Sequence, residues 1–156
     1  MTWSTSGGIS ALVDLLKIEN QEIQSVAASV LCNISENNEV RRSLTDARAG
    51  PILIQLLSSP VDEIQSRAAI ILSDIACVDD NQDALSEQGA IPALINLLES
   101  ELEDVLVNAV NAIRVLCTDN YENQTAVAQH EGVEPLVEFL GDTVNSGKRV
   151  VSLDAF

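Results

Sequence analysis

The chain has 156 residues, of which 46% are apolar but only 3% are aromatic, so its length suits one core built from Leu, Ile, Val and Ala. The formal net charge is −16, with 24 acidic against 8 basic residues. A surface this negative repels nucleic acid and anionic membranes; it either attracts basic peptides and proteins or simply keeps the chain soluble.

The first expected elements are a short and a long amphipathic helix. After a polar leader at 1–7, residues 9–17 place apolar side chains at spacings of three and four, which predicts a short helix with one buried face. Residues 20–36 continue the pattern over a longer stretch, with Asn20 as a suitable N-cap. The chain thus starts as two helices that need a partner to cover their apolar faces.

The same order of helices then recurs along the chain. Within 81–98, NQDALSEQGAIPALINLL, Gly89 supplies the freedom that a corner needs, and Pro92 stands where the next helix begins. The helices expected after residue 37 are, in order, 38–47, 51–58, 62–77, the pair within 81–98, 103–117, and a fourth start running from Asn123 to Leu140. The sequence therefore predicts an all-α protein.

A repeat of 41 or 42 residues underlies this order. Leucines recur at steps of 41, 41 and 42 residues, at Leu12, Leu53, Leu94 and Leu136. Four further columns keep the step of 41: Ile23, Ile64 and Val105; Ala27, Ala68 and Ala109; Leu31, Leu72 and Ile113; and Ile34, Ile75 and Leu116. Helices copied at one period bury their apolar faces by stacking on one another.

With three helices in a period near 42, the chain resembles the armadillo repeat. The resemblance rests on NQDALSEQGAIPALINLL followed by EDVLVNAVNAIRVLC and on the counterparts NQEIQSVAASVLCNIS and DEIQSRAAIILSDIA, and it covers residues 8–140. It implies a right-handed α-solenoid with the long third helices on the concave face. The array would span 8–141, in units of about 8–37, 38–79, 80–120 and 121–141; HEAT repeats, with two helices per unit, are the alternative architecture.

Two departures from the regular pattern carry expectations. Gly50 stands where the other units have an apolar residue, so the corner at 47–51 should be looser than its counterparts. The first and last units are incomplete, and the tail at 142–156 has no helical stripe and is expected to be flexible. Either the array continues in a longer protein, or its ends are covered by another copy or by a partner.

Catalytic patterns are not evident. His130 is the only histidine and comes at the end of a short helix, and no zinc spacing or phosphate loop occurs. We therefore expect no enzymatic activity, no cofactor and no metal. A hydrolase or transferase with Cys77 or Cys117 as nucleophile is the competing hypothesis, and it requires a thiolate of low pKa. The unpaired cysteines, including Cys32, indicate reduced thiols and a cytoplasmic or nuclear location.

Binding is expected on the third helices. In armadillo proteins that hold extended peptides, a Trp and an Asn four residues apart on this helix line the groove. Mapped onto this sequence, the resemblance implies the protein-binding candidates Ser29, Asn33, Ile70, Asp74, Asn111 and Val115. Only Asn33 matches the pattern and the tryptophans are absent, which disfavours a nuclear-import-receptor type of groove for basic peptides.

Other residues of these helices leave alternatives open. Glu22, Glu63 and Asp104 form an acidic row that either favours the helix N-termini or meets Lys and Arg of a partner. Ile70 and Val115 are either an exposed anchor for a partner or extra core. The predicted function is a scaffold that binds a partner protein or an extended peptide, with a basic partner as one candidate. The alternative is a structural segment that self-associates through exposed repeat ends.

Overall fold

The computed structural model describes residues 5–78 and 80–146, and the regular secondary structure of these residues is helical. The helices follow in the expected order, each amphipathic segment of the sequence forming its own helix. They are α1 (Thr5–Leu16), α2 (Gln21–Ile34), α3 (Asn38–Asp46), α4 (Ala49–Leu56), α5 (Asp62–Ala76), α6 (Asn81–Glu87), α7 (Ala90–Asn96), α8 (Glu103–Cys117), α9 (Tyr121–Gln129) and α10 (Val133–Ser146). A short 3-10 turn, η1 (Leu97–Glu99), extends α7.

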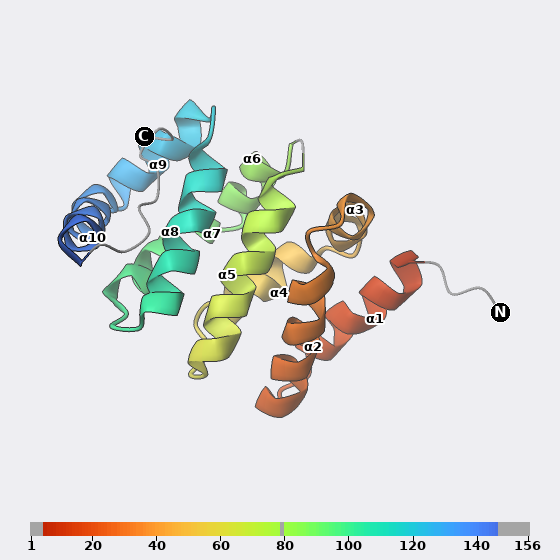
Figure 1. The fold of residues 1–156 in the computed structure, drawn as a ribbon. Helices are drawn as coiled ribbons and strands as arrows, with labels where there is room; N and C mark the ends of the chain where they lie inside the picture. Colours follow the sequence, from red (N-terminus) through yellow and green to blue (C-terminus); the bar gives the residue numbers. More distant parts are fainter. Residues whose placement is uncertain (1–4, 79, 147–156) are drawn as a thin grey trace.

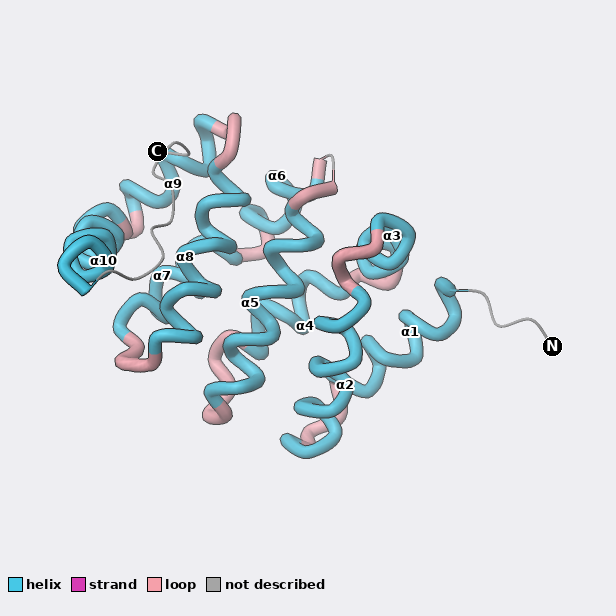
Figure 2. Tube along the Cα trace, in the orientation of Figure 1, coloured by secondary structure: helices cyan, strands magenta, loops and turns pink. Residues whose placement is uncertain are grey.

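The helices stack along one direction and do not close into a bundle. The long helices α2, α5 and α8 lie side by side across the front of Figure 1, α4 and α7 lie behind α5 and α8, and α3, α6 and α9 follow the upper edge. Short loops join them at the upper and lower edges (Figure 2). The prediction of an all-α solenoid of three-helix units is therefore confirmed.

The recurring apolar columns form one continuous core. Leu53, Leu94 and Leu136 are buried at equivalent places in successive units, and their counterpart Leu12 packs on the core while remaining half-buried. Because each unit buries its apolar face against the next, the period seen in the sequence is the period of the stack.

Three corners between the first and second helices of a unit share a left-handed backbone. Gly89 has a φ of 92°, while Arg48 and Glu131 adopt φ values of 55° and 58°. Only glycine adopts this region without steric cost, so the two charged residues hold a strained conformation that the flanking helices impose.

The corner at Gly50 differs from expectation. Gly50 is buried, and a Cβ at this position would meet the Gln88 side chain and lie 3.1 Å from Leu85 Cδ2 of α6. The missing side chain therefore admits the next unit closely, so the prediction of a looser corner is wrong.

The ends of the array also differ from the boundaries drawn from the sequence. Helix α1 begins at Thr5, inside the segment 1–7 expected to be a leader. Helix α10 continues to Ser146, past the boundary expected at residue 141. The remainder of the expected flexible tail, residues 147–156, lies outside the described residues.

Candidate functional site: the face of the long helices

Acidic residues begin two of the long helices. Asp62 and Glu63 occupy the first turn of α5, and Glu103 and Asp104 that of α8. Negative charge is favourable at a helix N-terminus, because the first backbone N–H groups have no partner within the helix. The exposed Glu22 of α2 completes the acidic row that the sequence predicts.

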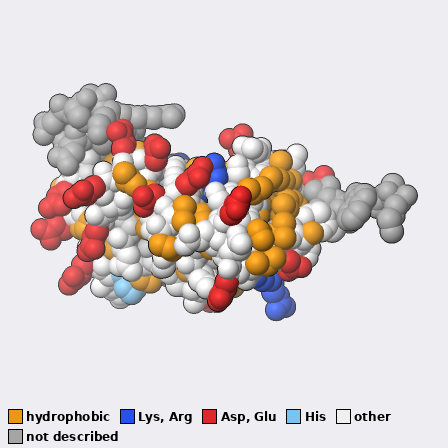
Figure 3. All heavy atoms as spheres, turned by 90° about the horizontal axis from the view of Figure 1, so that it is seen from below, with side chains coloured by type: hydrophobic (Ala, Val, Ile, Leu, Met, Phe, Trp, Pro, Cys, Tyr) orange, Lys and Arg blue, Asp and Glu red, His pale blue; other side chains and the backbone are white. Residues whose placement is uncertain are grey.

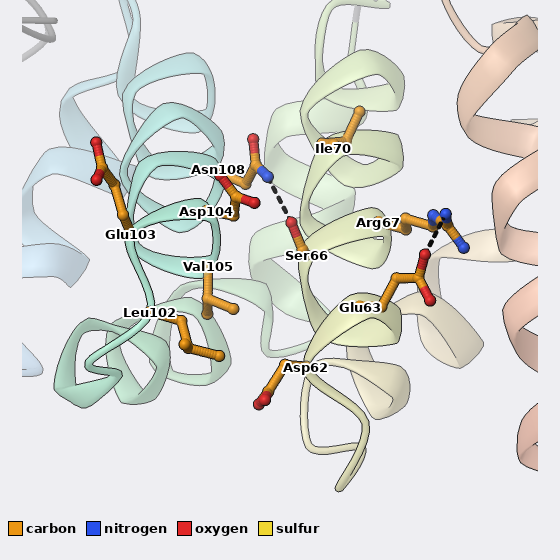
Figure 4. Close-up of a pocket in the computed structure, with 10 residues that line it drawn as sticks. All are labelled: Asp62, Glu63, Ser66, Arg67, Ile70, Leu102, Glu103, Asp104, Val105 and Asn108. Atoms are coloured by element: carbon orange, nitrogen blue, oxygen red, sulfur yellow. Dashed lines mark hydrogen bonds and ion pairs between the residues drawn. The ribbon is translucent and has the colours of Figure 1, made fainter.

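A groove of about 580 Å³ lies between these two helix starts (Figure 4). The residues that line it are Asp62, Glu63, Ser66, Arg67 and Ile70 from α5, Leu102 just before α8, and Glu103, Asp104, Val105 and Asn108 from α8. Its walls therefore combine carboxylates with apolar side chains.

Several polar groups in the groove are held by bonds within the protein. Asn108 Nδ2 donates to Ser66 Oγ at 2.6 Å, which ties α8 to α5. Arg67 pairs with Glu63 and turns away from the groove toward α2, where its Nη1 donates to the Ser25 carbonyl at 3.3 Å (Figure 4). Asp62 is exposed at the rim of the groove.

The six candidate binding residues do not form one patch. Ile70 is half-buried and lines the groove between α5 and α8. Asn33 is exposed and lines a second hollow, beside α1 and α3. Ser29 is half-buried on α2, and Val115 packs against the core as a partly buried side chain. Of the two apolar candidates, Ile70 thus faces a groove and Val115 adds to the core.

The other two candidates are engaged in polar contacts. Asp74 Oδ1 lies 3.2 Å from Arg41 Nη2, and its Oδ2 accepts a 2.6 Å hydrogen bond from Ser35 Oγ. Asn111 Nδ2 donates to Ser73 Oγ at 3.2 Å, while its Oδ1 accepts from Arg114 Nη2 at 2.9 Å. Both side chains therefore connect neighbouring helices in this structure.

Sequence reasoning missed the polar contact of Ser66 with Asn108. These residues lie about one turn before Ile70 and Asn111 on the same helix faces, so the helical period pointed to them. Leu102 was also missed, because it lies outside the helices, directly before α8. Its side chain is exposed beside the groove.

The asparagine of the repeated Asn-Gln pair has a structural role. Asn81 Nδ2 donates to the Ile75 carbonyl at 2.9 Å and to Thr45 Oγ1 at 2.8 Å. Asn123 repeats the arrangement one unit later, with bonds to the carbonyls of Leu116 and Gln82 at 2.8 and 3.3 Å. These amides cap the end of a long helix and bind the preceding short helix, so they hold the units in register.

The groups considered for catalysis have other environments. Burial raises the pKa of the Cys117 thiol to about 12, so at neutral pH it is protonated and does not supply the thiolate that a nucleophile needs. Burial likewise raises the pKa of Cys32 to about 11, against an opposing effect of Arg67. His130 is exposed and ends α9, where its backbone N–H bonds to the Ala126 carbonyl.

The described part of the chain offers neither a metal cluster nor a membrane-spanning helix. Residues 5–78 and 80–146 contain no group of three or more His, Cys, Asp or Glu side chains arranged to hold a metal ion. Over the same ranges, none of the helices has both the length and the apolar character needed to cross a membrane. The face of the long helices offers non-covalent contacts: charge, hydrogen bonds and apolar surface.

Comparison with known proteins gives a consistent result. The sequence profile described as Armadillo/beta-catenin-like repeat matches residues 2–36 and 79–118. A comparison with curated protein sequences finds no significant match.

Solved structures match over most of the chain. An engineered protein superposes with a TM-score of 0.80 at 32% identity, over 86% of this chain and 55% of that chain. A computationally designed armadillo repeat protein for modular peptide recognition gives 0.79 at 32%, over 86% and 57%. A designed armadillo repeat protein in complex with the peptide (KR)4 gives 0.77 at 30%, over 85% and 56%. The chain spans a little over half the length of these structures.

Proposed function

This chain is an array of armadillo repeats, and on that premise we propose that it is an interaction scaffold that holds a partner protein or extended peptide against its long helices. The observation that carries the proposal is the groove between α5 and α8, where exposed carboxylates stand beside apolar side chains. A site of this composition binds by shape, charge and hydrogen bonds.

The charge of the groove selects the kind of partner. Asp62 and Asp104 are exposed on opposite walls, and the chain as a whole carries a net charge of −16. Lys or Arg side chains of a partner would meet both the local carboxylates and a field that speeds their approach. The designed armadillo repeat protein in complex with the peptide (KR)4 supports a basic segment as the ligand, since it has the same fold as this chain.

Apolar contacts would fix the register of that segment. Ile70 and Leu102 lie in the same groove as the acidic residues. A partner with basic side chains and an aliphatic residue between them would use both kinds of wall. Ile70 is therefore the member of the six candidates for which the geometry argues most directly, and Asn33 would extend the contact toward α1 and α3.

Calorimetric titration with a peptide of alternating Lys and Arg tests the proposal. The double variant Asp62→Asn with Asp104→Asn should weaken binding by about tenfold, equivalent to about 1.4 kcal/mol, because two exposed charges facing the ligand are lost. The matched control is Asp46→Asn with Glu87→Gln, which removes the same charge from exposed positions outside the groove. Equal weakening by both double variants would mean that only net charge attracts the peptide and would refute the groove.

A second titration tests the helix-face candidates. Ile70→Ala and Asn33→Ala should each lower the affinity for the peptide. Neither should lower the midpoint of thermal unfolding, because neither residue is fully buried. Asp74→Ala is unsuitable for this purpose, since its loss removes the partner of Arg41. Unchanged affinity in both variants would remove Ile70 and Asn33 from the site.

A further inference from the structure

The outer face of the first unit exposes side chains whose counterparts are buried in the next two units. Ile23 of α2 is 37% exposed, whereas Ile64 of α5 and Val105 of α8 are 0% and 1% exposed. Val30 is 40% exposed, while Ile71 and Ala112 at the same place in α5 and α8 are both fully buried. Leu15 of α1 is 39% exposed, against 4% for Leu56 and 7% for Leu97.

The interior units indicate what covers these positions. Helix α2 packs against α5, and α5 packs in the same way against α8. The covering helix presents small side chains: Cys32 Sγ of α2 contacts the Arg67 carbonyl of α5 at 3.4 Å, and Ser66 of α5 bonds to Asn108 of α8. Small residues allow the two long helices to approach closely.

The outer face of α2 is more apolar than its interior counterparts. Val26 occupies the position that Arg67 and Asn108 hold in α5 and α8, where both make hydrogen bonds to the preceding unit. Val26 is 61% exposed, and it forms a stripe with Ile23 and Val30. Hydrophobic side chains gather toward the right-hand end of the molecule in Figure 3, the end at which α1 and α2 lie in Figure 1. A terminal unit that ends a stack needs a polar outer face, and this one lacks it.

We propose that this N-terminal end face, defined as Leu15, Ile18, Ile23, Val26 and Val30, docks one further armadillo-type unit stacked ahead of α1, whose long helix lies against α2 as α2 lies against α5. Continuity with the two interior boundaries supplies the geometry of the contact. The occupant presents a ridge of Ser, Ala and Cys, like the one α2 offers to α5. A second copy of the chain is a poorer occupant, because two molecules of net charge −16 repel each other.

The test supplies the missing unit from the chain itself. A copy of residues 38–88 is fused directly to Gly7, in place of residues 1–6. Gly7 and Gly89 occupy equivalent positions two repeats apart, so the copied α6 leads into α1 as α6 leads into α7 in the chain itself. The copied α5 then presents Ser66, Ala69 and Ser73 to α2. Circular dichroism should report helical signal from the added unit, and the fused chain should unfold in one transition.

Val26→Glu is then measured in the chain alone and in the fused chain. In the chain alone the exposed side chain should tolerate the change, with the thermal midpoint unchanged within about one degree. In the fused chain the new carboxylate is trapped between α2 and the added helix, so Tm should fall by several degrees. The matched control is Val137→Glu at the opposite end, 58% exposed, which should shift Tm equally in both proteins.

Three results would overturn the proposal. The first is an equal effect of Val26→Glu in both proteins, which would mean that the added unit does not cover the face. The second is an added unit that remains unfolded. The third is a dimer of the unmodified chain in sedimentation equilibrium that Val26→Glu dissociates, since the face would then serve a second copy.

Discussion

The boundary between the first and second units and the boundary between the second and third units share one geometry but differ in chemistry. At the boundary between the first and second units, Ser35 of the first unit contacts a charged pair of the second. The Ser35 carbonyl accepts from Arg41 Nε at 2.9 Å, and the Ser35 hydroxyl donates to Asp74, the ion-pair partner of Arg41. Between the second and third units, amide side chains hydrogen-bond to the end of the long helix instead: Asn81 Nδ2 donates to the Ile75 carbonyl at 2.9 Å. The position of Asn81 is occupied by Val40 in the second unit, which cannot donate.

The comparison indicates that a repeat constrains the apolar columns more than the polar contacts. Stacking needs apolar residues at given positions of each helix, while any group with a donor in reach can satisfy the carbonyls at the end of a long helix. Each polar solution depends on several residues together. A change in one member therefore has different consequences at the two boundaries.

Removal of the carboxylate at the charged boundary should have the largest effect. Asp74 and Arg41 are only 14% and 18% exposed, so Asp74→Ala leaves a largely buried cation without its carboxylate and removes the shorter hydrogen bond of the Ser35 hydroxyl. We expect a loss of about 3 kcal/mol in the free energy of unfolding, measured by urea denaturation. Glu63→Ala, which removes the more exposed partner of Arg67 at the same boundary, should cost below about 1 kcal/mol. Equal costs would mean that burial does not distinguish the two pairs.

The amide boundary should respond more weakly. Asn81→Ala removes the two hydrogen bonds that this buried amide donates, to the Ile75 carbonyl and to Thr45 Oγ1, and we expect it to cost about 2 kcal/mol in the same assay. Asn96→Ala, at an exposed position of α7, is the control and should be near neutral. A loss for Asn81→Ala no larger than that for Asn96→Ala would show that the amide is dispensable.

Alkaline pH should weaken the stack through its buried thiols. The pKa of Cys117 is raised from 9.0 to about 12 in the folded chain, so the protonated thiol favours folding below pH 9, and this contribution is lost as pH rises from 9 through 12. The loss should reach about 1 kcal/mol near pH 10. Cys117→Ala should flatten the fall of stability over this range, although it lowers stability at neutral pH. Cys77→Ala should keep the wild-type slope, because both thiols of raised pKa remain.

The smallest effects are expected at the corners within units. A Cβ at Gly89 would have no atom within 4 Å, but the backbone φ of 92° is unfavourable for alanine. Gly89→Ala should therefore lower the free energy of unfolding by about 1 kcal/mol. Arg48→Gly relieves the same conformation and should raise stability by up to about 1 kcal/mol. Thermal unfolding monitored by circular dichroism measures both. A stabilising Gly89→Ala or a strongly destabilising Arg48→Gly would contradict the role assigned to backbone strain.

Candidate binding residues were harder to predict than the fold. Mapping by repeat position placed Asp74 and Val115 on an open face. However, Arg41, which is 33 residues away in sequence, pairs with Asp74, and Val115 packs on the core. The contact of Asn108 with Ser66 joins residues 42 apart. Such pairings depend on how one unit is rotated against the next, which the period alone does not specify.

The sequence by itself determined that the chain is an armadillo-type stack. Its apolar residues recur at helical spacing every 41 or 42 positions, and such faces are buried only when successive units stack on one another. It also predicted the N-cap at Asn20 and the corner at Gly89. Only the tertiary structure decided that Gly50 admits α6 closely, that the groove lies between α5 and α8, and that the outer face of α2 is left uncovered. Local patterns specify helices and their buried sides, whereas close approach, polar pairing and exposure arise from the placement of one unit against another.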